Sequence, residues 1–178
     1  NTLQIVVDAK ANTLQLFSLQ PQFENDSELS FEENSWVLNA TAKLNPIEST
    51  ESVTFHPDDV QKGKQGLSSE ELALYYNEMS DYGIEYGSTF QTLHRCWSDE
   101  NAALGWLELG DSNFYGAFML HPALADGALQ LLAIMFRERR KSGKATGLHL
   151  PVAVKQFRVY STGHSRLWAH STLTRVDE

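Results

Sequence analysis

The chain of 178 residues is 42% hydrophobic and 21% charged, a composition typical of one soluble globular domain. Its net charge of −9 and isoelectric point near 5.1 argue against a surface for nucleic acid or an anionic membrane. No apolar run is long enough to span a bilayer. The single cysteine, Cys96, excludes an internal disulfide and a cysteine-based metal cluster. We therefore expect a cytoplasmic protein that contacts neither nucleic acid nor membrane and has no metal site.

Three short segments near the start of the chain are β-prone. Residues 3–7 and 13–19 flank a polar loop, and residues 35–44 carry apolar side chains at alternate positions. These features predict three strands of a meander. Because no helix accompanies them, they cannot form a stable unit alone. Residues 45–66 carry prolines, glycines and charges without an apolar period, which predicts a linker.

A second region begins with a helix signature. Ser68 is followed three residues later by Glu71, the spacing of a capping box, and the helix should end before Gly83. Its apolar side is formed by Leu72, Leu74, Tyr75, Tyr76 and Met79. Four strand patterns follow, at residues 89–97, 102–109, 147–160 and 166–174.

The longest apolar run in the chain spans residues 120–136. Pro122 suits the first turn of a helix, and the basic residues in 137–141 favour the other end. We predict a helix from about residue 122 to residue 141. Because it is apolar on every side, we expect it to be buried and wrapped by other elements. A buried helix with antiparallel strands before and after it predicts an α+β fold with the sheet curled around the helix.

Asp126 lies in the first turns of this apolar helix, and Gln130 lies one turn further on and faces the same way. A carboxylate in that position is costly unless it is paired or protonated. One interpretation is functional, since a carboxyl held by an amide in an apolar setting suits proton transfer near neutral pH. The other is structural, since an aspartate can satisfy the early backbone N–H groups of a helix. The residues alone favour neither.

Three segments carry a family resemblance. His121–Gln130 resembles the aspartate motif, D-x-x-x-Q/H preceded by H-P, of the dehydratase domains of type I modular polyketide synthases. Gly83–Gln91 resembles the G-Y-x-Y-G-P-x-F segment of that family, and Leu150–Val154 resembles its L-P-F-x-W segment. Three matches in the same order make the resemblance specific.

The fold of that family is a double hot dog, in which two units of helix and sheet pack side by side. The resemblance implies a partial double hot dog. Residues 1–44 would be closing strands of a first hot-dog unit and residues 45–66 the linker. Residues 67–178 would form the second hot-dog unit, with the central helix at about 122–141.

The chain also departs from the family pattern. Ile84 stands where the family prefers Tyr, Ser88 where it has Pro, and Val152 and Val154 where it has Phe and Trp. The motif H-x-x-x-G-x-x-x-x-P, which carries the family's catalytic histidine, is absent. None of the histidines has Gly and Pro four and nine positions later; they are His56, His94, His121, His149, His164 and His170.

The resemblance implies a reaction and its partners. In the family, the histidine removes the α-proton of a 3-hydroxyacyl group on an acyl carrier protein, and the aspartate protonates the departing hydroxyl. Asp126 would therefore be the acid and Gln130 would orient it. No cofactor is implied beyond the phosphopantetheine arm of the carrier, and neighbouring synthase domains are expected partners. The implied substrate-binding residues are Tyr86, Gly87, Phe90, His121, Leu150 and Pro151.

Three hypotheses stay open. The chain is part of a dehydratase whose histidine lies upstream, or a catalytically inactive scaffold, or a relative that isomerises a double bond or closes an ether ring. The retained Asp126 and Gln130 favour the first, and the departures from the motifs favour the second. The chain starts without a methionine, so we expect it to be cut from a longer protein. Apolar residues such as Leu14, Leu16 and Trp36 would lack cover, which predicts a homodimer or an adjoining domain.

Overall fold

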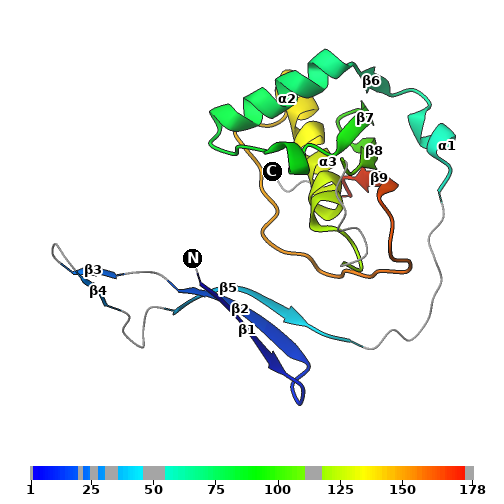
Figure 1. Ribbon diagram of the computed structural model, residues 1–178. Coiled ribbons are helices and arrows are strands. Elements are labelled where there is room, and N and C mark those ends of the chain that lie inside the picture. Colours follow the sequence, from blue (N-terminus) through cyan, green and yellow to red (C-terminus); the bar gives the residue numbers. More distant parts are fainter. Residues whose placement is uncertain are drawn as a thin grey trace. The chain divides into compact units, whose positions relative to one another are not determined.

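The computed structural model describes residues 2–19, 22–24, 28–30, 36–45, 55–110 and 118–174. The chain divides into two compact units, Asn1–Glu51 and Ser52–Glu178 (Figure 1). The first unit contains strands only in its described part, whereas the second combines helices with a sheet.

The first unit is built on a three-stranded antiparallel sheet in the order β1-β2-β5. The strands are β1 (Leu3–Asp8), β2 (Thr13–Leu19) and β5 (Trp36–Lys43), which confirms the three predicted strands. The β1–β2 loop is closed by Asp8, whose Oδ1 accepts hydrogen bonds from the backbone N–H groups of Lys10 and Ala11. A small hairpin that we did not predict, β3 (Gln22–Glu24) and β4 (Glu28–Ser30), lies in the chain between β2 and β5.

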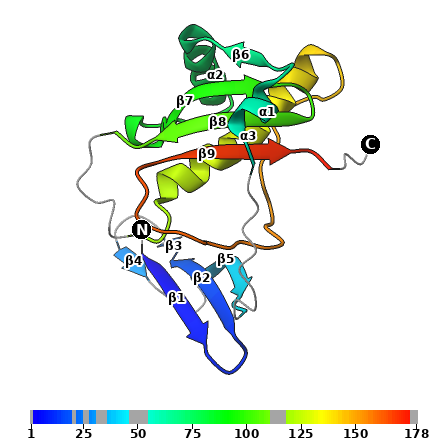
Figure 2. The ribbon, with the colours of Figure 1, turned by 90° about the vertical axis from the view of Figure 1, so that its right-hand side faces the viewer.

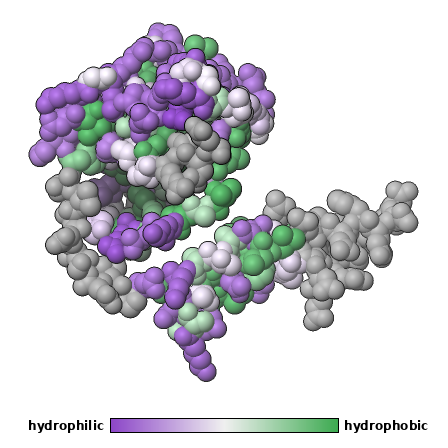
Figure 3. All heavy atoms as spheres, turned by 180° about the vertical axis from the view of Figure 1, so that it is seen from behind, coloured by the Kyte–Doolittle hydropathy of each residue, from purple (hydrophilic) through white to green (hydrophobic). Residues whose placement is uncertain are grey.

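One face of the β1-β2-β5 sheet is apolar. Its register places Ile5 opposite Leu16, and Leu16 opposite Ala40. Because alternate side chains share a face, Val7 lies on the same face as Ile5. The side chain of Ile5 is 63% exposed, and all of β1 is exposed. Figure 3 shows such hydrophobic side chains at the surface of this unit.

The second unit is built on a four-stranded antiparallel sheet in the order β6-β7-β8-β9. The strands are β6 (Gln65–Leu67), β7 (Leu93–Ser98), β8 (Ala102–Glu108) and β9 (Arg166–Thr172). Its helices are α1 (Pro57–Gln61), α2 (Ser69–Asp81), α3 (Pro122–Lys141) and the short 3₁₀ helix η1 (Ser88–Phe90). In Figure 2, α3 runs along the sheet, and it contacts β8 and β9. This arrangement confirms the predicted α+β architecture.

Local signals in the sequence set the bounds of the two long helices. At the start of α2, Ser68 Oγ accepts a hydrogen bond from the N–H of Glu71, and the Glu71 carboxylate accepts one from the N–H of Ser68. This is the predicted capping box. At the start of α3, Pro122 occupies the first turn and His121 Nδ1 accepts a hydrogen bond from the N–H of Ala123. Both helices therefore begin where the sequence predicted.

The α3 helix forms the centre of the core. Its buried side chains include Leu124, Leu131 and Ile134, which pack with Leu107 of β8 and Tyr75 of α2. The expectation that α3 is buried on every side is wrong for one side, because Leu129 is 40% exposed.

An ion pair between a buried arginine and a partly exposed glutamate ties α2 to α3. Arg137 Nε donates a hydrogen bond to Glu78 Oε2 at 2.8 Å, and Arg137 Nη2 donates to Oε1 at 2.9 Å. This bidentate pairing is the main cause of the raised pKa of Arg137. The pair holds α2 against α3. The same packing places Tyr76 of α2 in contact with Gln130, nearer the start of α3.

An aromatic ladder covers the face of the sheet that points away from α3. A Cβ at Gly105 would lie 2.9 Å from Leu131 of α3, so Gly105 faces that helix and the adjacent Trp106 faces away. Trp106 and Trp168 lie on neighbouring strands with ring centroids 5.0 Å apart, and Trp97 lies 5.9 Å from Trp168.

Two sequence predictions are wrong in this unit. Residues 147–160 form no strand and are exposed along most of their length, with Val152 98% exposed. A strand requires a neighbour to satisfy its backbone groups, and this segment has no strand pairing within the described chain. The start of the predicted strand 89–97 is the 3₁₀ helix η1. In residues 45–66, whose role as a linker stays a prediction, the structure places α1 and the start of β6.

Candidate active site

Gln130 and Asp126 are joined near the start of α3. Gln130 Nε2 donates a hydrogen bond to Asp126 Oδ2 at 2.8 Å and another to the backbone carbonyl of Phe90 at 2.9 Å. The Tyr76 hydroxyl donates to Gln130 Oε1 at 3.2 Å. The Gln130 side chain is 2% exposed, whereas Asp126 is half-buried. The amide is thus locked by three partners and presents one fixed N–H group to a carboxyl that solvent reaches.

A close approach between α3 and Thr92 fixes the position of the first turns of α3, which carry Asp126. Thr92 Oγ1 donates a hydrogen bond to the backbone carbonyl of Ala123 at 3.2 Å. A Cβ at Gly127 would lie 2.3 Å from that same Oγ1. Only glycine fits there, so Gly127 allows the first turns of α3 to sit directly against the strand that begins at Leu93.

Three tyrosines form a cluster that contacts Gln130 through the Tyr76 hydroxyl. The rings of Tyr75 and Tyr76 have centroids 5.2 Å apart, and those of Tyr76 and Tyr86 are 5.7 Å apart. Burial raises the pKa of Tyr76 to about 12 and raises those of Tyr75 and Tyr86. The charge of Asp126 adds to the increase at all three phenols. All three are therefore neutral hydroxyl groups that can donate hydrogen bonds at neutral pH.

The other predicted substrate-binding residues lie in two segments. Tyr86 is half-buried, and its backbone carbonyl accepts a hydrogen bond from Gln91 Nε2 at 2.7 Å, while exposed Gly87 precedes η1. His121 lies at the N-terminus of α3, where its ring meets that of Phe118 edge-on at 5.1 Å. Leu150 and Pro151 lie in the irregular segment 147–160 and are exposed. That these two residues line a substrate channel stays a prediction.

Residues 54–178 match the family model described as the polyketide synthase dehydratase N-terminal domain. The chain belongs to the polyketide synthase dehydratase family. The matching region covers the whole described part of the second unit, including Asp126, Gln130 and the three tyrosines.

Relatives of the dehydratase domain are polyketide synthases. Polyketide synthase GfsA of Streptomyces halstedii is 32% identical over 133 residues, which cover 74% of this chain and 2% of the relative. Polyketide synthase PksN of Bacillus subtilis (strain 168) is 32% identical over 99 residues, which cover 54% of this chain and 2% of the relative. The chain thus spans about 2% of the length of these two relatives.

Solved structures confirm the predicted hot-dog fold. The dehydratase domain from the CurF module of curacin polyketide synthase is 24% identical with a TM-score of 0.72, and the match covers 98% of this chain and 58% of that one. The dehydratase domain from the CurK module is 24% identical with a TM-score of 0.65, covering 95% of this chain and 55% of that one. This chain therefore spans little more than half of either solved dehydratase domain.

Apart from His121, the histidines of this chain have the following surroundings. The His149 ring stacks on Phe136 with centroids 4.0 Å apart, His164 is hydrogen-bonded to Ser161, and His170 lies against Phe55. His94 is exposed on β7, and His56 precedes α1. Within the described residues, no group of three or more His, Cys, Asp or Glu side chains could hold a metal ion. No helix in that part of the chain has the length and apolarity of a membrane span.

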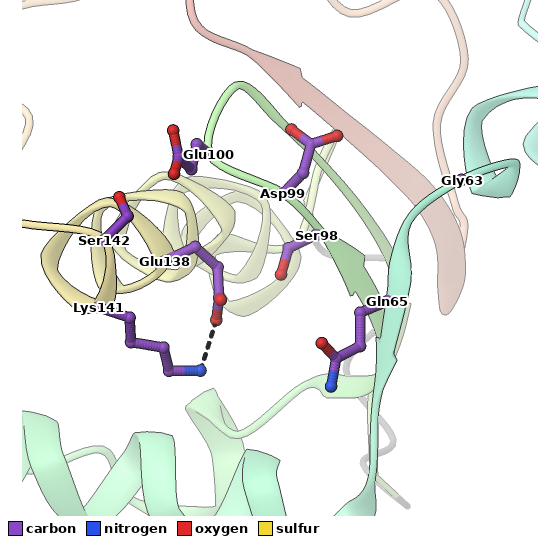
Figure 4. Close-up of a pocket in the computed structure, with 8 residues that line it drawn as sticks. All are labelled: Gly63, Gln65, Ser98, Asp99, Glu100, Glu138, Lys141 and Ser142. Carbon is purple, nitrogen blue, oxygen red and sulfur yellow. Dashed lines mark hydrogen bonds and ion pairs between the residues drawn. The ribbon is translucent and has the colours of Figure 1, made fainter. Parts of the chain in front are cut away.

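A polar pocket of about 400 Å³ lies at the other end of α3 (Figure 4). Glu138 lies roughly 18 Å along the helix axis from Asp126, at 1.5 Å per residue. The charged groups here pair with each other, since Lys141 binds Glu138 and Lys144 binds Glu100, which lowers the pKa of Glu100. The pocket is lined by Gly63, Gln65, Ser98, Asp99, Glu100, Glu138, Lys141 and Ser142. It is therefore separate from the Asp126 site.

Sequence reasoning found Asp126 and Gln130 but missed the residues that hold them. Thr92 was included in a predicted strand, and Tyr75 and Tyr76 were assigned only to the apolar side of α2. The one available signal was the presence of two hydroxyl groups on that apolar side, because buried hydroxyl groups usually have polar partners.

Proposed function

We propose that this dehydratase domain supplies the acid for removing water from a 3-hydroxyacyl group on an acyl carrier protein. The observation that carries the proposal is the 2.8 Å hydrogen bond from the locked Gln130 amide to Asp126 Oδ2. Because Oδ2 is held as an acceptor, Oδ1 is the oxygen available to carry a proton. A half-buried carboxyl with one oxygen fixed and the other free to donate suits general-acid catalysis.

The reaction balances with one acid and one base. A base removes a proton from C2 of the acyl chain, the C2–C3 double bond forms, and the C3–O bond breaks. Asp126 gives its Oδ1 proton to the departing hydroxyl, which leaves as water. Asp126 is then reprotonated by the proton taken from C2, so that no cofactor is consumed.

We assign the base to a histidine of the parent protein outside this chain. The described histidines all hold other positions, and the chain spans little more than half of the solved dehydratases. Structures of the CurK dehydratase include two inactive mutants, one with aspartate replaced by asparagine and one with histidine replaced by phenylalanine. That enzyme needs both residue types, which supports an acid and base pair here.

The same reasoning assigns the parts of the chain. Residues 1–44 would close a first hot-dog unit, residues 45–66 would connect the units, and residues 67–178 would form the second unit. The natural partners would be an acyl carrier protein and the neighbouring domains of a polyketide synthase. Tyr86, Gly87 and Phe90 would line the substrate channel beside Asp126, with His121, Leu150 and Pro151 as further wall residues.

The test is a mass-spectrometric assay of the parent protein with a 3-hydroxyacyl group loaded on its carrier protein. Asp126→Asn keeps the size of the side chain but removes the acid, so we expect the rate of water loss to fall by roughly 10²–10⁴-fold. Asp81→Asn, at the exposed end of α2, is the matched control. Equal rates for wild type and Asp126→Asn would contradict the proposal. No water loss by the unmodified parent would favour the scaffold hypothesis.

A further inference from the structure

The Tyr76 hydroxyl is the partner of Gln130 that comes from another helix. Its oxygen lies 3.2 Å from Gln130 Oε1, and Gln130 is 2% exposed. At the other atom of the amide, Nε2 donates to the Phe90 carbonyl at 2.9 Å and to Asp126 Oδ2 at 2.8 Å. Within the described part of the chain Tyr76 makes no hydrogen bond to Asp126 itself. An effect of Tyr76 on the acid therefore passes through Gln130.

The Phe90 carbonyl determines the direction of these bonds. A backbone carbonyl can only accept, so the amide presents its Nε2 to Phe90 and its Oε1 to Tyr76. The phenol must then donate to Oε1, and it keeps its proton because burial raises the pKa of Tyr76 to about 12. Each group from Tyr76 to Asp126 thus donates to the next, and in such a chain one hydrogen bond strengthens its neighbour.

The ring of Tyr76 is placed by contacts that do not involve Gln130. Its centroid lies 5.2 Å from that of Tyr75 and 5.7 Å from that of Tyr86, which it meets edge-on. Two residues further along α2, Glu78 accepts the two hydrogen bonds from Arg137 of α3. The packing of α2 therefore sets the position of the phenol. A phenylalanine would keep these ring contacts and lose only the donor.

We propose that Tyr76 is a positioning residue for dehydration, whose hydroxyl fixes the Gln130 amide and, through it, the orientation of Asp126. Without this donor, Oε1 is a buried acceptor with no partner, which is costly. An amide that rotates to find another donor breaks its present bonds and releases Asp126 Oδ2. The acid on α3 is thus aligned by a side chain of α2, 54 positions before Gln130 in the chain. This inference rests on the dehydration proposed above.

The first test is Tyr76→Phe in the parent protein, in the carrier-protein assay. The control is Tyr82→Phe, since Tyr82 is exposed at the end of α2. We expect Tyr76→Phe to lower kcat about tenfold, the effect of one aligning hydrogen bond, with KM almost unchanged. Tyr82→Phe should leave both constants as they are. A kcat of Tyr76→Phe equal to that of the wild type would overturn the role.

A double-mutant cycle with Gln130→Leu separates positioning from stability. In the wild-type background, Tyr76→Phe should lower the melting temperature, because Gln130 Oε1 loses its donor. In the Gln130→Leu background it should raise the melting temperature, because it removes a hydroxyl that already lacks its partner. The kcat of the double variant should nevertheless equal that of Gln130→Leu. A kcat that rises with the melting temperature, or that falls tenfold further, would overturn the inference.

These measurements also distinguish this inference from the proposed function. Melting of the 178-residue chain needs no substrate, so equal effects of Tyr76→Phe in both backgrounds overturn the inference even if dehydration proceeds. A parent protein that loses water, fails to do so as Asp126→Asn and is unaffected by Tyr76→Phe overturns the Tyr76 role alone. A parent protein that never loses water overturns the proposed function, and this inference with it.

Discussion

One amide controls the geometry of the acid. Gln130 Nε2 donates two hydrogen bonds and its Oε1 accepts one, so the orientation of the amide is fixed. Asp126 Oδ2 is therefore held in place by the N–H group that it binds. Asp126 needs this support because it lies on an apolar helix with no cationic partner recorded at its carboxyl among the described residues. At the scale of the residue, the site is therefore a carboxyl with one oxygen held by a fixed amide, and in the proposed reaction the other oxygen would carry the proton.

Replacing Gln130 should harm both stability and activity. Gln130→Leu has a similar volume but leaves the Phe90 carbonyl and the Tyr76 hydroxyl without their partner. We expect the free energy of unfolding to fall by about 1–3 kcal/mol. We expect the dehydration rate to fall about tenfold or more, because Oδ2 is no longer held. Urea denaturation and the carrier-protein assay measure the two effects.

The control for that substitution is Gln65→Leu, on the exposed strand β6. A Gln130→Leu protein that matches this control in both measurements would show that the amide does not orient the acid.

At the scale of the element, the sequence predicted what local signals determine. The capping box of α2, Pro122 at the start of α3 and the alternation in β1, β2 and β5 are all properties of neighbouring residues. The segment 147–160 has a strand-like composition but no strand to pair with, and composition cannot reveal that. The three-residue β6 exists because Leu67 lies opposite Cys96 of β7, a contact between distant parts of the chain.

The contacts of the candidate site show the same difference between neighbouring and distant residues. Asp126 and Gln130 are four residues apart on one helix, so their contact was predictable from spacing. Tyr76 is 54 residues from Gln130, and Thr92 is 31 residues from Ala123. These partners depend on how α2 and β7 pack against α3, which no local pattern specifies.

The packing of α3 against Thr92 can be tested at Gly127. Gly127→Ala would bring a methyl group into the 2.3 Å contact with Thr92 Oγ1, so either α3 or the hydrogen-bonded Thr92 side chain must shift. We expect a loss of about 1–3 kcal/mol in the free energy of unfolding, measured by urea denaturation, and a lower dehydration rate because Asp126 moves with the helix.

A second substitution serves as the control for this clash. Thr92→Ala removes the oxygen that the new methyl group meets, so Gly127→Ala should cost less in that background than in the wild type. An unchanged stability of Gly127→Ala in the wild-type background would contradict the close approach.

At the scale of the whole molecule, the two units differ in how well they bury their apolar residues. The second unit has a core around α3, whereas the β1-β2-β5 sheet exposes Leu3, Ile5 and Val7 and has no helix in the described part of its unit. A sheet with one uncovered apolar face is a surface for association. The difference supports an adjoining domain or a second copy as the cover.

The isolated chain should therefore self-associate or bind a hydrophobic dye. Ile5→Ser combined with Leu16→Ser, on one face of the sheet, should reduce both, whereas Gln4→Ser with Gln15→Ser, on the opposite face, should not. Sedimentation velocity and dye fluorescence measure the two properties. A wild-type chain that sediments as a clean monomer and binds no dye would contradict the prediction.

The tryptophan ladder makes the two units optically distinguishable. Of the four indoles in the chain, Trp97, Trp106 and Trp168 lie together on the sheet of the second unit, and Trp36 lies alone in β5 of the first. Closely spaced indoles couple their electronic transitions, so the near-ultraviolet circular dichroism of the chain originates chiefly in the second unit. Emission from Trp36, isolated by replacing the other three with Phe, reports on the first. Circular dichroism of the wild-type chain and emission of the variant that keeps only Trp36 thus follow the unfolding of the two units without an added label.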